Sequence, residues 1–152
     1  MNAAEMLDNV HLRTIRALDD LPELQWDIPG ACGNWTVKEI VAHLTSYELA
    51  LAEGLKTFLG QPSTRTYISR LLEDGAKFNE EEVEKRRYTT AQRVMDDYND
   101  AQIQTVSLLE QIPAEKLQQK GTADRSPNDF ITSFYNHAVE HCEQIEKFRN
   151  RS

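Results

Sequence analysis

Four long stretches of this chain repeat apolar residues about every 3.5 positions, and no other feature of the sequence constrains the fold as much. Such a repeat places the apolar side chains along one face of a helix, and that face must be buried against another helix. The four stretches lie at about 3–21, 36–58, 90–112 and 127–149. Together they predict an all-α protein built as a four-helix bundle.

The starts of these stretches carry the signals that begin helices. Thr36, with Glu39 three residues later, has the pattern of a capping box. Ser126 stands in the N-cap position ahead of Pro127, a residue that suits the first position of a helix. Residues 60–88 are less regular and predict short helical pieces between the second and third long helices.

Composition narrows the class of protein. The length of 152 residues predicts a single domain, 1–152, and the formal charge of −8 disfavours binding to nucleic-acid phosphates. No apolar stretch approaches the roughly 20 residues of a membrane span, and the start of the chain has no signal-peptide core. Two cysteines, Cys32 and Cys142, are typical of a reducing compartment. We therefore expect a cytoplasmic protein that binds a small molecule rather than nucleic acid or membrane, with a homodimer left open.

The last stretch carries His137 and His141 at positions where a bundle normally places Leu or Ile. Side chains four residues apart on a helix share one face, roughly 5–6 Å apart at Cβ, so both rings can bind one divalent ion. His43, near the edge of the apolar face of the second stretch, is the candidate third ligand. Three imidazoles leave a coordination position for water or substrate, and they must be neutral, so affinity should weaken below about pH 6.5. The alternative is a pair of core histidines, each hydrogen-bonded to a neighbour.

Other residues have less specific patterns. The sequence H-x-x-E-H at 137–141 matches a metalloprotease motif, but only 11 residues follow His141, too few for the downstream ligand of such enzymes.

Glu140 is expected to be a surface carboxylate, with proton transfer beside the metal as the alternative. Glu48 is expected to pair with a buried Arg or Tyr, or else to support the metal ligands. His11 is expected to be hydrogen-bonded or half-exposed rather than a ligand. Three aromatic residues at helical spacing are candidates for the wall of a pocket: Tyr47, Phe134 and Tyr135.

Two segments resemble the signatures of a known family. Residues 33–44, a Trp-Thr start followed by a helix that carries His43, resemble the second helix of the DinB/YfiT-like superfamily. The pair His137 and His141 is similar to the superfamily's second signature, on its fourth helix. Phe78-Asn79 resembles a pair in the branch near mycothiol-dependent maleylpyruvate isomerase. That branch carries a further C-terminal domain, and its lack here argues against isomerase activity.

The resemblance implies a bundle of up-down-down-up topology in which residues 60–88 form a long crossover between helices 2 and 3. It also implies a divalent metal, commonly zinc or nickel, held by His43, His137 and His141 with water completing the shell. Characterised relatives include S-transferases and isomerases that use low-molecular-weight thiols such as mycothiol or bacillithiol. The expected function is a metal-dependent enzyme that transfers or activates a small thiol. The alternative is a non-catalytic, small-molecule-binding or stress-related bundle with a vestigial or structural metal site.

Overall fold

The computed structural model describes residues 1–120 and 125–151, which form helices joined by loops. The four long helices are α1 (Ala3–Leu18), α2 (Val37–Phe58), α5 (Ala91–Glu110) and α6 (Pro127–Arg151). The shorter elements are α3 (Thr66–Glu73), α4 (Gly75–Arg86) and the 3-10 turns η1 (Glu23–Asp27) and η2 (Ala114–Lys116). The only β pairing among the described residues is an isolated bridge between Cys32 and Trp35, so the all-α prediction is confirmed.

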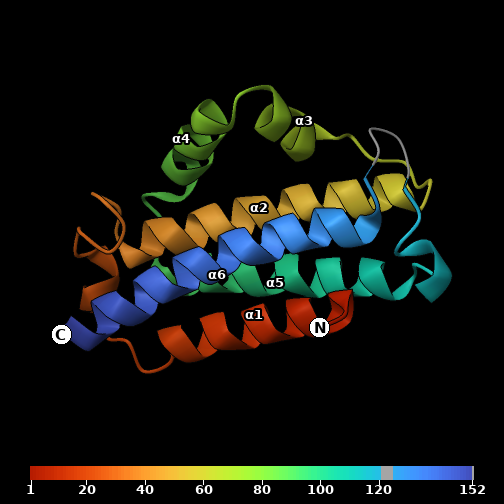
Figure 1. Ribbon diagram of the computed structural model, residues 1–152. Helices are drawn as coiled ribbons and strands as arrows, with labels where there is room; N and C mark the ends of the chain where they lie inside the picture. Colours follow the sequence, from red (N-terminus) through yellow and green to blue (C-terminus); the bar gives the residue numbers. More distant parts are fainter. Residues whose placement is uncertain (121–124, 152) are drawn as a thin grey trace.

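The four long helices lie side by side, and α3 and α4 lie across the outer side of α2 (Figure 1). α2 contacts α5 and α6, and α1 contacts the same two helices, so the contacts close a ring. The colours of Figure 1 show α1 and α6 running toward one end of the molecule and α2 and α5 toward the other. Residues 60–88, which contain α3 and α4, therefore connect two helices that run in the same direction.

Helix ends differ from the predicted ones by a few residues. The first helix was expected over 3–21, but α1 ends at Leu18. Asp20 has φ of 59°, a left-handed conformation that a right-handed helix does not contain. Leu21 still packs against the core, which explains why its side chain fits the helical repeat. In the same way, α5 ends at Glu110 while the buried Ile112 belongs to the turn that follows.

The two helices that carry the histidines both begin with reciprocal side-chain caps. Thr36 accepts a hydrogen bond from the backbone N–H of Glu39 at 3.1 Å, and the Glu39 carboxylate accepts one from the N–H of Thr36 at 3.0 Å. Ser126 and Asp129 exchange the same pair of bonds, each at 3.1 Å. These bonds lower the pKa of the Asp129 carboxyl, because they favour its charged form. The predicted capping box is confirmed, and it fixes where α2 begins.

The crossover is attached to the bundle by buried carboxylates. Glu53 of α2 accepts hydrogen bonds from the backbone N–H groups of Tyr67 and Ile68, both at 2.7 Å, and so caps the start of α3 from another helix. Glu82 of α4 is bonded both by Arg70 of α3, at 3.1 Å, and by Arg86 of α4, at 3.0 Å. The Glu53 bonds hold α3 against α2, the helix that carries His43, and the Glu82 bonds join α4 to α3. Within the described ranges, no helix has the length and apolar character needed to cross a bilayer.

Gly54 allows α2 and α6 to approach closely. A Cβ atom added at Gly54 would lie 2.2 Å from Cε1 of Phe130, well inside van der Waals contact. We expect Gly54→Ala to lower the free energy of unfolding by roughly 1–3 kcal/mol, measured by urea denaturation. The matched control is Gly75→Ala, where the nearest atom would be 3.9 Å away, so stability should be unchanged or slightly higher. Equal stability of the Gly54 variant and the wild type would show that Phe130 moves aside freely.

Candidate metal centre

Three histidine side chains from two helices meet at one point. The Nε2 atom of His137 lies 2.9 Å from Nε2 of His43 and 3.1 Å from Nε2 of His141. One ligand atom from each ring lies within 4.8 Å of the other two, an arrangement that could hold a metal ion. The structure therefore brings together the three residues that the sequence singled out, although 94 positions separate His43 from His137.

Helical geometry explains the cluster. His137 and His141 are one turn apart on α6, with ring centroids at 4.6 Å, and their helix packs against α2. His43 enters from α2 at centroid distances of 4.8 Å and 4.7 Å from the other two rings. The capping box of α2 begins seven residues before His43 and fixes the helix from which the ring projects.

The positions of the three nitrogens fit a shared cation. Nitrogens bound at about 2.0–2.1 Å to a tetrahedral ion would lie roughly 3.3 Å from one another. The two Nε2–Nε2 separations in the structure, 2.9 Å and 3.1 Å, are close to that value. A neutral imidazole has a single lone pair on its acceptor nitrogen, so His137 Nε2 cannot accept from both neighbours. A cation between the rings would satisfy all three lone pairs.

The Nδ1 atoms of the three histidines, which face away from the cluster, differ in their surroundings. Nδ1 of His141 lies 2.7 Å from the amide oxygen of Gln144, which fixes the proton on Nδ1 and leaves Nε2 free to bind a metal. Nδ1 of His43 and Nδ1 of His137 are buried without a hydrogen-bond partner among the described residues. Sequence reasoning missed Gln144. Its position three residues after His141, on the same helical face, was the available signal.

Burial keeps the three rings neutral. Burial, together with the neighbouring His137 and His141, lowers the pKa of His43 to about 2. Burial, aided by His141, lowers the pKa of His137 to about 4. The pKa of His141 is lowered by burial, against the opposing effects of the Gln144 hydrogen bond and the Glu140 charge. Neutral imidazole is the form that binds metals, so the cluster is ready to coordinate at neutral pH.

Aromatic rings surround the histidines. Tyr47 of α2 stacks on His137, with centroids 4.1 Å apart and 15° between the planes, and lies 4.5 Å from His43. The indole ring of Trp35 lies 5.0 Å from His43 on another side. Burial raises the pKa of the Tyr47 hydroxyl, and a hydrogen bond with Asn79 of α4 partly offsets this rise. Trp35 therefore forms one wall of the site.

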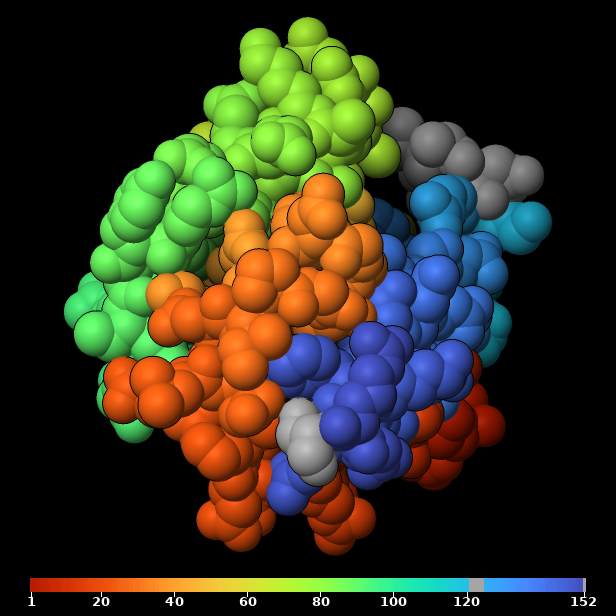
Figure 2. Space-filling model, turned by 90° about the vertical axis from the view of Figure 1, so that its left-hand side faces the viewer, coloured from red at the N-terminus to blue at the C-terminus, as the bar shows by residue number. Residues whose placement is uncertain are grey.

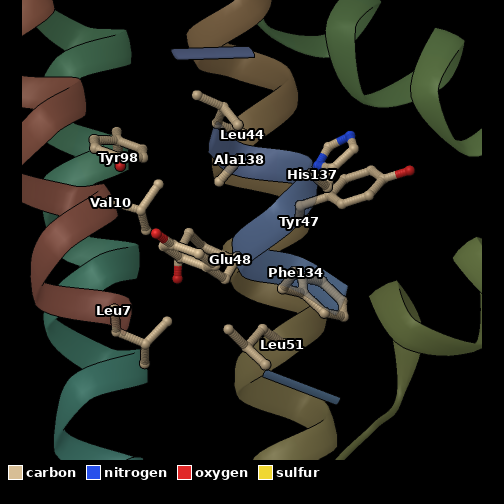
Figure 3. Close-up of a pocket in the computed structure, with 11 residues that line it drawn as sticks. Leu7, Val10, Leu44, Tyr47, Glu48, Leu51, Tyr98, Phe134, His137 and Ala138 are labelled. Atoms are coloured by element: carbon tan, nitrogen blue, oxygen red, sulfur yellow. The ribbon is translucent and has the colours of Figure 1, made fainter. Parts of the chain in front are cut away.

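The predicted aromatic pocket exists but is small. The cavity drawn in Figure 3 has a volume of about 10 Å³ and is lined by Tyr47, Phe134 and Tyr135, together with Glu48 and His137. This volume is close to the minimum that holds one water molecule, so the cavity is not a substrate pocket as it stands.

Glu48 pairs with a residue that the sequence did not indicate. Its Oε1 lies 2.5 Å from Nε2 of His11 on α1, so the expected Arg or Tyr partner was wrong. Both side chains are buried, and the contact explains how His11 is accommodated in the core. In Figure 3, Glu48 points toward α1 and Tyr98, whereas His137 lies beside Tyr47 on the opposite side of the view. Glu140 is exposed, as expected of a surface carboxylate, and its alternative role in proton transfer beside the metal stays a prediction.

The His11–Glu48 contact gives a test that separates stability from metal binding. Glu48→Gln keeps the shape of the side chain but removes the charge that strengthens the bond to His11. We expect the free energy of unfolding to fall by roughly 1–3 kcal/mol, with metal stoichiometry unchanged. Chemical denaturation and metal analysis of the same preparation measure the two quantities. A tenfold loss of metal affinity would instead place Glu48 among the groups that support the ligands.

The fold and the cluster define an all-helical protein with a candidate three-histidine metal site. The chain belongs to the DinB superfamily, whose family model matches residues 6–145. This match covers α2 and all three histidines. Neither a curated protein nor a solved structure matches the chain.

Proposed function

We propose that this protein binds one divalent metal ion through His43, His137 and His141 and uses it to activate a small thiol for transfer to an electrophile. The observation that carries the proposal is the approach of three neutral imidazole nitrogens from two helices. Membership of the DinB superfamily agrees with a metal-binding role. Zinc and nickel are the metals we propose, because both bind imidazole well.

We also infer an up-down-down-up bundle, supported by the helix directions visible in Figure 1. We propose that the protein binds a small molecule and binds neither nucleic acid nor a membrane, consistent with the formal charge of −8. A cytoplasmic location is proposed because Cys32 and Cys142 are both free.

The bound ion would act as a Lewis acid that lowers the pKa of a thiol and so raises the fraction present as the nucleophilic thiolate. The residues of the chain prepare the site for this chemistry. Gln144 orients His141 through the 2.7 Å contact at Nδ1. Trp35 and Tyr47 exclude water from the sides of His43 and His137, which keeps these rings neutral.

A second candidate is a non-catalytic bundle in which the metal only stabilises the fold. The observation that favours it is the volume of about 10 Å³ for the cavity beside His137, which is far smaller than a substrate. In this case the ion would bind but would not exchange water for a thiol.

One experiment separates the two candidates. The purified protein is analysed for metal, reloaded with cobalt and titrated with 2-mercaptoethanol while the visible spectrum is recorded. We expect one ion per chain and a new thiolate-to-cobalt band that saturates with thiol. Cobalt binding without such a band would overturn the transferase proposal and favour the structural role, and no cobalt binding would overturn both.

A further inference from the structure

The side chain of Tyr47 combines contacts with the histidines and an outward-pointing hydroxyl. Its ring lies against two of the three imidazoles, at 4.1 Å from His137 and 4.5 Å from His43. Figure 3 shows its hydroxyl pointing out of the bundle, toward the α3–α4 side of the molecule. Figure 2 shows a recess between the α3–α4 segment, in yellow-green, and α6, in blue. The hydroxyl of the half-buried Tyr47 therefore lies on the α3–α4 side of the histidines.

The crossover supplies a residue that holds this hydroxyl in place. Asn79 of α4 hydrogen-bonds to Tyr47, and because the amide oxygen of Asn79 has no partner among the described residues, its amide N–H is the donor to the phenol oxygen. A phenol carries one O–H donor in addition to its acceptor lone pairs. With Asn79 bonded to a lone pair, the O–H of Tyr47 is left to donate to another group.

Burying the side-chain oxygen of Asn79 lowers the stability of the fold, and packing does not explain why a polar residue stands there. Its Oδ1 atom is buried without a partner among the described residues, next to Phe78, which is only 1% exposed. A buried amide oxygen without a donor is destabilising, and an apolar residue there would avoid the penalty. A polar side chain kept at such a place is explained by its contact with Tyr47.

We propose that Tyr47 is the hydrogen-bond donor that the site offers to its small-molecule ligand, and that Asn79 positions the Tyr47 hydroxyl for this role. The ligand class is an anionic sulfur or oxygen donor, because a phenol O–H donates best to a charged acceptor. The choice of a thiol as the ligand rests on the proposed function. The Tyr47 hydroxyl could donate the same hydrogen bond to any anion held beside His137. Tyr47 thus selects and orients the ligand, while the three histidines hold the metal.

The test uses cobalt-loaded protein and two probes, 2-mercaptoethanol and azide, each titrated by visible absorption. Tyr47→Phe keeps the ring and its stacking on His137 but removes the hydroxyl. We expect unchanged cobalt stoichiometry and dissociation constants about 10–100-fold higher for the probes that the wild type binds. Asn79→Ala should give a smaller loss, and the double variant should lose no more than Tyr47→Phe alone, because both changes act on one hydrogen bond.

The matched control is Tyr67→Phe. This half-exposed residue of α3 lies outside the histidine cluster, and its hydroxyl accepts a bond from Lys85 at 3.3 Å. Its dissociation constants should equal those of the wild type. Wild-type affinities in Tyr47→Phe, or loss of cobalt from that variant, would overturn the proposal.

The two probes separate failure of this inference from failure of the proposed function. If the wild type binds azide but not the thiol, the thiol function fails, and the azide affinities of the variants still decide the role of Tyr47. If the wild type binds neither probe, the site exchanges no ligand and both proposals are overturned.

Discussion

Replacing His137 with alanine is expected to remove essentially all bound metal from the protein. His137 is the central residue of the cluster, because its Nε2 lies within 2.9 Å of His43 and 3.1 Å of His141. Two remaining imidazoles from different helices would make a weak site. The loss should exceed the roughly 10–100-fold that follows removal of a residue that only supports a ligand. His43→Ala and His141→Ala should behave in the same way, measured as metal content after gel filtration.

The control for the histidine variants is His11→Gln, which replaces the fourth histidine of the chain. His11 of α1 is buried and paired with Glu48 of α2, away from the cluster, and glutamine keeps an N–H donor for that carboxylate. Its metal content should match that of the wild type. Far-UV circular dichroism shows whether each variant is folded, so that metal loss is not confused with unfolding. Full metal in His43→Ala, together with loss in His137→Ala, would mean that the third ligand is another residue.

Local signals explain why the sequence predicted the helices and the histidines. A capping box such as Thr36–Glu39 involves residues three apart, and the His137–His141 pair involves residues four apart, so both can be recognised along the chain. His43 required more than spacing, because nothing local relates it to residues 94 positions later. The resemblance to the DinB signatures supplied that link.

Apart from the local contact between Gln144 and His141, the contacts that sequence reasoning missed depend on how helices pack. His11 and Glu48 are 37 residues apart, and each fits its own helix without indicating the other. The stacking of Tyr47 on His137 likewise depends on the rotation of α2 against α6. Periodicity gives the buried face of each helix, but it does not give the pairing of polar residues within that face.

The metal-free protein is expected to lose stability as the pH falls from about 6.5 to 4. In the unfolded chain each histidine has a pKa near 6.5, whereas burial lowers the pKa of His43 to about 2 and that of His137 to about 4 in the folded protein. Between these values the unfolded chain binds more protons than the folded one, so protonation favours unfolding. The free energy of unfolding should fall by up to about 1.4 kcal/mol per pH unit for each histidine that stays neutral. Above pH 6.5 this contribution is constant.

The lowered pKa values of His43 and His137 also change the pH at which metal is lost. Because the folded rings stay neutral below pH 6.5, we expect metal affinity to persist to lower pH than an unperturbed histidine would allow. Urea denaturation of the metal-free protein at pH 7, 6, 5 and 4 measures the stability effect. His43→Leu removes one group that must stay neutral, so its stability should depend less on pH than that of the wild type. Equal pH dependence of the two proteins would show that His43 is not held neutral in the fold.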